Sequence, residues 1–196
     1  AEARWLPSDN GVVEAEAFEK AINDDTAIVY IDQPSWFNGY MFDIDSIGEI
    51  AHDHGAYFVV DTTQSMGAID WRIDETSVDF AGTSTFKWLL GGIPAASAGF
   101  LYMKKEYIDE YSPAYVSGGT YDYEQKGVNG QYMEHEFKLK KGIKKYEVFR
   151  SPNFTFKAVA NSMKVLLDHG MKEIEKQNNK IVTRIIDQLL DKGYKL

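Results

Sequence analysis

Residues 59–87 read VVDTTQSMGAIDWRIDETSVDFAGTSTFK, and this stretch decides how the whole chain is interpreted. An apolar run, Ala56–Val60, ends on Asp61, and a second run, Val78–Ala81, is followed by Lys87. Short apolar runs bounded by turn residues are typical of buried strands. The sequence therefore predicts an acid and a lysine at or just beyond the carboxyl ends of two strands, the edge at which open α/β sheets bind ligands.

Both residues also have an ordinary structural interpretation. An aspartate at a strand end often only caps a turn or a helix. A lysine between two aromatic residues, here Phe86 and Trp88, is commonly a surface lysine whose apolar stem packs beside the rings. Neither residue alone indicates a functional site. The choice between a structural and a functional role therefore depends on the surrounding motifs.

Four short motifs follow one another in one order along this part of the chain: D-x-x-Q-x-x-G from Asp61, V-D-F from Val78, S-x-x-K-W-L from Ser84 and G-F-L-Y from Gly99. As a set they resemble the class V branch of the fold-type I pyridoxal-phosphate (PLP) enzymes. That branch includes cysteine desulfurases, kynureninases, isopenicillin N epimerase-like proteins and several aminotransferases. The resemblance is strong over residues 27–102 and weaker from residue 146 onward.

The resemblance implies a role for each of five residues. Lys87 matches the lysine that holds PLP as a Schiff base and then acts as the catalytic general base. Asp61 matches the carboxylate that keeps the pyridine nitrogen protonated, so that the ring can act as an electron sink. Gln64 matches the donor to the phenolic oxygen of the cofactor, and Ser84 matches a hydroxyl that binds its phosphate. Ser151 occupies the place of the threonine in the family's Gly-Thr-Pro-Asn, which reaches the phosphate across a dimer interface.

The function implied is that of a PLP-dependent enzyme acting on an amino acid, with class V aminotransferase chemistry as the first expectation. Phe86 stands where desulfurases usually have a histidine, which weakens the desulfurase alternative, but desulfurase or lyase chemistry and epimerase chemistry stay open. A further alternative is a catalytically incomplete module that only folds or interacts. Nucleotide binding is disfavoured, because residues 82–87 lack the second glycine of a Walker loop and nothing fits G-x-G-x-x-G.

The periodicity of the first half predicts one βαβ unit. Residues 27–31 form a β-rich run, residues 43–55 have the apolar spacing of an amphipathic helix that stops at Gly55, and the run Ala56–Val60 follows. A right-handed crossover into a parallel sheet is expected. With the resemblance, this predicts an α/β fold: a mostly parallel sheet with helices on both faces, whose strand at residues 98–103 runs antiparallel.

Two apolar stripes in the last quarter of the chain predict two long helices packed as core, one ending at Gly170 and one at Gly193. The family resemblance then divides the chain. We expect residues 1–150 to be the central part of the PLP-binding large domain. We expect residues 151–196 to be helices that lead toward a small C-terminal domain absent from this chain.

Composition limits the partners. The 196 residues carry a net charge of −9, and the first hundred hold only four basic side chains, which argues against a nucleic-acid partner. No apolar run approaches membrane-spanning length, and the absence of cysteine excludes disulfides and thiolate metal sites. His52 and His54 lie on different faces of the predicted helix, so a metal pair is not expected. We expect a cytoplasmic homodimer with an amino-acid substrate and no bound metal.

Overall fold

The structure is a computed structural model that describes residues 2–92, 98–122, 138–148 and 153–195. Its internal contacts divide the chain into two compact units. The first contains Ala1–Tyr102 and Phe154–Leu196, and the second contains Met103–Asn153. The two units are described separately. The domain boundary expected at residue 150 stays a prediction.

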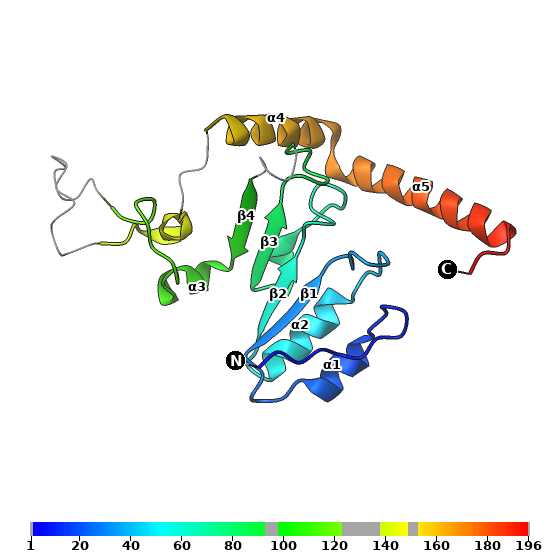
Figure 1. The fold of residues 1–196 in the computed structure, drawn as a ribbon, viewed down its shortest axis with the longest axis horizontal. Helices are drawn as coiled ribbons and strands as arrows, with labels where there is room; N and C mark the ends of the chain where they lie inside the picture. Colours follow the sequence, from blue (N-terminus) through cyan, green and yellow to red (C-terminus); the bar gives the residue numbers. More distant parts are fainter. Residues whose placement is uncertain (1, 93–97, 123–137, 149–152, 196) are drawn as a thin grey trace. The chain divides into compact units, whose positions relative to one another are not determined.

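The first unit is built on a four-stranded sheet in the order β1 (Ile28–Asp32), β2 (Tyr57–Asp61), β3 (Phe80–Ser84) and β4 (Gly99–Met103) (Figure 1). The first three strands are parallel. Burial alternates along β1 and β2, where Val29, Ile31, Phe58 and Val60 are buried, because successive side chains of a strand point to opposite sides.

The fourth strand runs in the opposite direction. Thr85 N donates to Ala98 O at 3.0 Å, and a Cβ built on Gly99 would lie 3.2 Å from Thr83 O. Residue 98 thus lies beside residue 85, and residue 99 lies beside residue 83. Because the residue numbers rise along one strand while they fall along the other, β4 is antiparallel to β3. The predicted α/β fold with a mostly parallel sheet is confirmed.

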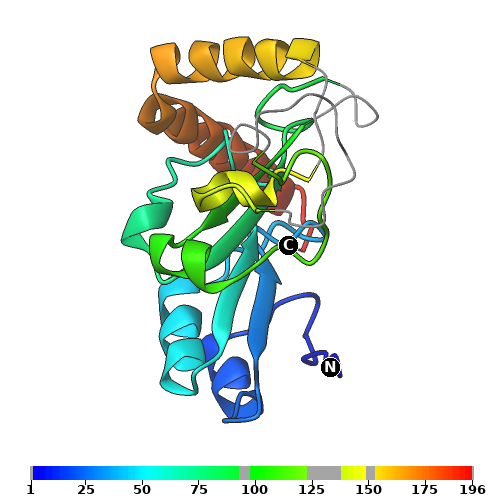
Figure 2. The same cartoon turned by 90° about the vertical axis from the view of Figure 1, so that its left-hand side faces the viewer.

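Helices α1 (Ala15–Ala21) and α2 (Ile44–Asp53) cover one face of β1 and β2 (Figure 2). The core between them contains Phe18 from α1, Ile47 from α2 and Phe58 from β2, all less than a tenth exposed. The opposite face of β1 is uncovered: Ile28 and Tyr30 are each 60% exposed.

The aspartate of the V-D-F motif has a structural task. Asp79 is fully buried just before β3, where its backbone N–H donates to Phe58 O at 2.9 Å and its carboxylate accepts from Phe58 N at 2.8 Å. The same carboxylate oxygen lies 2.8 Å from His52 Nε2 on α2. Asp79 thus joins the start of β3 to β2 and to the covering helix.

The two C-terminal helices are present as predicted, α4 (Asn153–His169) and α5 (Met171–Asp191). Their packing differs from the prediction. Val159 on α4 is buried, but more than half of the surface of Leu167, Ile181, Ile185 and Leu190 is exposed. The interpretation of both stripes as core is therefore wrong for these side chains, because no described segment of the chain covers them.

The second unit contains α3 (Lys105–Glu110) and a short 3₁₀ helix, η4 (Gly142–Tyr146). The Tyr146 hydroxyl lies 2.7 Å from Tyr111 O and 3.2 Å from Ile108 O, at the end of α3. Burial, and then the charge of Asp109, raises the pKa of Tyr146. The phenol therefore stays a neutral donor that ties η4 to α3.

Candidate functional site

The candidate site lies at the carboxyl edge of the parallel strands. The register places Asp32 opposite Asp61 and Asp61 opposite Gly82, so the last residue of β2 lies between its two neighbouring strands. Neighbouring strands are about 4.8 Å apart. Ser84, the last residue of β3, follows two positions beyond Gly82. The sheet thus brings the predicted Asp61 and Ser84 to the same edge.

A threonine connects these two predicted residues. Thr63 N donates to Asp61 Oδ1 at 2.8 Å, and Ser84 N donates to Thr63 Oγ1 at 3.0 Å. The adjacent Thr62 is fully buried, and its backbone N–H donates to Gly82 O at 2.8 Å. Sequence reasoning missed Thr63; the pair of hydroxyl residues directly after Asp61 was the available signal.

A tyrosine on β1 is also part of this edge and was not predicted. Although Tyr30 is 60% exposed, partial desolvation of its phenol raises its pKa, and the negative charges of Asp61 and Asp32 raise it further. The phenol therefore remains protonated at neutral pH. It therefore does not add a third negative charge to the two carboxylates of Asp32 and Asp61.

The glycine of D-x-x-Q-x-x-G places the loop after β2 against the lysine segment. Gly67 has a φ of +95°, and a Cβ at this position would lie 2.8 Å from Trp88 O and 3.2 Å from Leu89 Cδ2. Only a residue without a side chain permits this approach. Gln64 lies in the turn between Asp61 and Gly67, so the same contact holds its loop beside the segment that carries Lys87.

Lys87 lies in a turn that two backbone hydrogen bonds close. Gly91 N donates to Thr85 O, and Leu90 N donates to Lys87 O at 3.1 Å. The side chain of Thr85 is fully buried and bonds the backbone of Ala98 on the next strand segment. The amine of Lys87 lies 5.7 Å from the centroid of the Phe86 ring, and the lysine is partly exposed.

The residues gathered here fit PLP by their chemistry. The edge offers a carboxylate at Asp61 for a protonated ring nitrogen, an amine at Lys87 and hydroxyls at Thr63 and Ser84 for oxygen atoms. Ser151, the fifth predicted residue, lies outside the described residues. Its role across a dimer interface stays a prediction.

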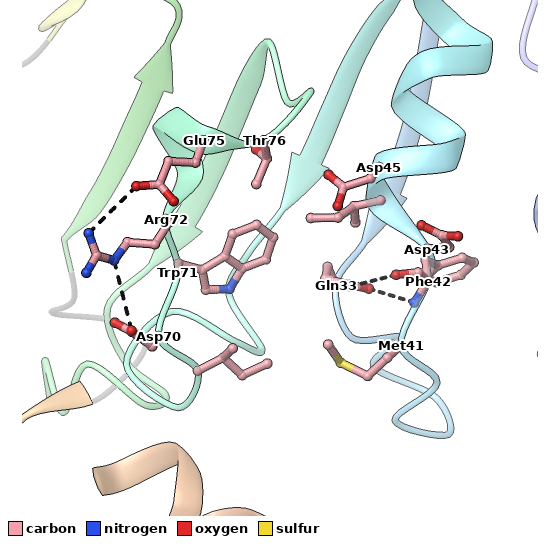
Figure 3. Close-up of a pocket in the computed structure, with 12 residues that line it drawn as sticks. Gln33, Met41, Phe42, Asp43, Asp45, Asp70, Trp71, Arg72, Glu75 and Thr76 are labelled. Atoms are coloured by element: carbon pink, nitrogen blue, oxygen red, sulfur yellow. Dashed lines mark hydrogen bonds and ion pairs between the residues drawn. The ribbon is translucent and has the colours of Figure 1, made fainter. Parts of the chain in front are cut away.

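A cavity of about 490 Å³ lies elsewhere, between the segment before α2 and the segment that ends in η1 (Ile73–Glu75) (Figure 3). The buried indole N–H of Trp71 has no partner among the described residues, and Arg72 pairs with Asp70 and Glu75. The predicted cofactor residues that the structure describes are not among those lining this cavity. It is therefore separate from the site at the sheet edge.

His52 in the last turn of α2 and the C-cap residue His54 each contact an aspartate. His54 Nδ1 lies 2.9 Å from Asp24 Oδ1, while His52 contacts the buried Asp79. Within the described ranges, no group of three His, Cys, Asp or Glu side chains is arranged to hold a metal ion. In the same part of the chain, the helices are too short or too polar to cross a bilayer.

Comparison with known proteins gives one family over almost the whole chain. The family model described as aminotransferase class-V matches residues 1–194. An uncharacterized aminotransferase of Bacillus subtilis, YcbU, is 29% identical over 192 residues, which are 97% of this chain and 48% of that protein. A probable cysteine desulfurase of Methanothermobacter thermautotrophicus is 34% identical over 112 residues, 57% of this chain and 27% of that protein.

Solved structures agree on the fold. The apo cysteine desulfurase of Thermococcus onnurineus has a TM-score of 0.77 at 26% identity and covers 96% of this chain with 44% of its own. A mutant of C-DES with glycine covalently linked to its PLP cofactor has a TM-score of 0.78 at 21% identity, covering 95% of this chain and 49% of that one. The chain thus spans about half the length of the proteins it matches most fully.

Proposed function

The chain belongs to the class V aminotransferase family, and on this premise we propose that it binds PLP at the carboxyl edge of its sheet and acts on an amino acid. The observation that carries the proposal is the pair of contacts between the two loops. Thr63 bonds both Asp61 and Ser84, and Gly67 lies against the backbone of the residue after Lys87. A carboxylate, an amine and hydroxyls are thereby held on adjacent loops.

When bound, PLP supplies an electron sink that stabilises negative charge at the α-carbon of an amino acid. Asp61 would provide the carboxylate that accepts a hydrogen bond from the protonated ring nitrogen. Gln64 provides an amide donor, and Ser84 a hydroxyl, for oxygen atoms of the cofactor. The amine of Lys87 would take the α-proton of the substrate as general base.

Transamination is the reaction that we propose first. The Bacillus relative that covers almost all of this chain carries an aminotransferase name, and Phe86 fills the position before the lysine. Desulfurase chemistry is the second candidate, favoured by the desulfurase relatives in both comparisons. Lyase and epimerase chemistry use the same α-proton transfer and belong to the same proposal. We further propose a cytoplasmic homodimer in which Ser151 of one subunit reaches the cofactor of the other.

The first test is an absorption spectrum of the chain after incubation with PLP and removal of the excess. We expect a visible band, borohydride reduction that fixes the cofactor onto Lys87 in a peptide mass map, and loss of both in Lys87→Ala. Lys20→Ala, a change at an exposed lysine of α1, serves as the control and should keep the band. If the chain shows no band, or if the label falls on another lysine, the proposed site is wrong for this chain.

A further inference from the structure

Two side chains of α5 bind the backbone of the loop that follows β2. Glu175 Oε2 accepts from Asp70 N at 3.1 Å, and Asn178 Nδ2 donates to Ala68 O at 3.1 Å. The partners are 105 and 110 residues apart in the chain. Residues three apart lie on one face of a helix, so Glu175 and Asn178 contact the loop together.

The loop needs these two contacts. Its own backbone bonds satisfy the N–H groups of Ala68 and Ile69, both of which donate to Ser65 O, and Trp71 N donates to Ile69 O. Within the described residues, this internal network uses neither Ala68 O nor Asp70 N, and α5 provides the partner of each. A part-buried backbone group without a partner destabilises the conformation that contains it.

The bound stretch lies immediately beyond the cofactor motif. Ala68 directly follows Gly67, whose contact with Trp88 O keeps the loop beside the lysine segment. If Ala68 and Asp70 move, Gly67 moves with them, and the turn that contains Gln64 is no longer held from its C-terminal side. The hydrogen bonds of α5 therefore act on the geometry of the site without contacting it.

We propose that Glu175 and Asn178 are positioning residues that hold the D-x-x-Q-x-x-G loop in its cofactor-binding conformation. This proposal rests on the proposed PLP site for its functional consequence, but the loop contacts themselves are independent of any ligand. It predicts that PLP affinity depends on two side chains of a helix far away in the sequence. Neither side chain is assigned a role by the family motifs.

Four variants test the two contacts separately. Glu175→Leu removes the acceptor, whereas Glu175→Gln keeps an acceptor oxygen on a side chain of the same length. Asn178→Asp replaces the donor by an acceptor of the same shape. Asn179→Asp makes the same charge change at an exposed neighbour on the same helix and is the matched control.

The first readout is amide hydrogen exchange of the loop in the chain without PLP. We expect Glu175→Leu and Asn178→Asp to speed exchange of the amides of residues 66–71 by about threefold to tenfold, the effect of losing one hydrogen bond. Glu175→Gln and Asn179→Asp should exchange like the parent chain. Equal exchange in all four variants would overturn the proposal, as would equal acceleration in the control.

The second readout is the dissociation constant for PLP, followed by the visible band. We expect a several-fold weaker affinity in Glu175→Leu and Asn178→Asp, with rescue in Glu175→Gln. An affinity unchanged in all variants, with faster loop exchange, would show that the helix holds the loop without positioning the site, and would overturn the inference. If the parent chain binds no PLP, the proposed function fails, while hydrogen exchange still decides whether α5 holds the loop.

Discussion

At the scale of single residues, Gly67 has a position in the site that excludes a side chain for two reasons. Its φ of +95° and the 2.8 Å distance from a built Cβ to Trp88 O are two separate obstacles to a side chain. A residue in a rarely populated backbone region costs about 1–3 kcal/mol. The steric contact adds to this, because the atom met is backbone and cannot turn away.

We therefore predict that Gly67→Ala lowers the free energy of unfolding by more than the backbone cost alone. Gly55→Ala is the matched control, since Gly55 has a φ of +73° but nothing within 4 Å of its built Cβ. Urea denaturation should show a larger loss for Gly67→Ala than for Gly55→Ala, and PLP binding should weaken only in the former. Equal losses would mean that the loop moves away from Trp88 at no cost.

At the scale of elements, α2 connects the two strands that provide Asp32 and Asp61, and its first turn depends on a carboxylate. Asp43 accepts from Ser46 N at 3.1 Å and from Ser46 Oγ at 2.7 Å. These hydrogen bonds lower the pKa of Asp43, the side-chain bond contributing more than the backbone bond. Loss of such an N-cap costs about 1 kcal/mol.

The lowered pKa of Asp43 sets the direction of a pH effect. A carboxylate with a depressed folded pKa stabilises the fold above its unfolded pKa of about 4 and loses this contribution as pH falls through the folded value. Asp43→Asn keeps an acceptor that does not titrate. We predict that the stability advantage of the parent chain over Asp43→Asn shrinks between pH 5 and pH 3 in urea titrations. An advantage that is constant with pH would contradict the assignment.

The elements also show where sequence reasoning succeeded and where it stopped. Short apolar runs bounded by turn residues located β1 and β2 to within a residue, because such runs are typical of strands in a buried sheet. The run that begins at Val78 predicted β3 too early, because Asp79 replaces a ladder hydrogen bond with its side chain and the strand begins at Phe80. Family motifs supplied Asp61 and Lys87, whereas the two hydroxyl residues directly after Asp61 were too general a signal to predict that Thr63 accepts from the backbone of Ser84.

At the scale of the whole molecule, the sequence did not indicate which apolar helix face packs against another part of the chain. The side chains of α4 and α5 have helical spacing, yet spacing does not say what covers a helix. Val159 is 1% exposed, whereas Ile181 and Ile185 on α5 are 55% and 51% exposed. Helical spacing therefore predicted both helices but not the exposure of their apolar side chains.

Exposed apolar side chains in a row should bind an environment-sensitive apolar dye, since contiguous apolar patches are sites of association. We predict that the double variant Ile181→Glu and Ile185→Lys binds less dye and unfolds with a free energy within about 0.5 kcal/mol of the parent, as expected for surface positions. The new side chains are spaced i, i+4 in the favourable order for a helical ion pair.

Val159→Ala is the buried control and should lose about 1–3 kcal/mol of unfolding free energy without lowering dye binding. A large loss of stability in the α5 variant would mean instead that this face is buried in solution, against another part of the chain or a second copy, and sedimentation of the parent chain at several concentrations would tell these two apart.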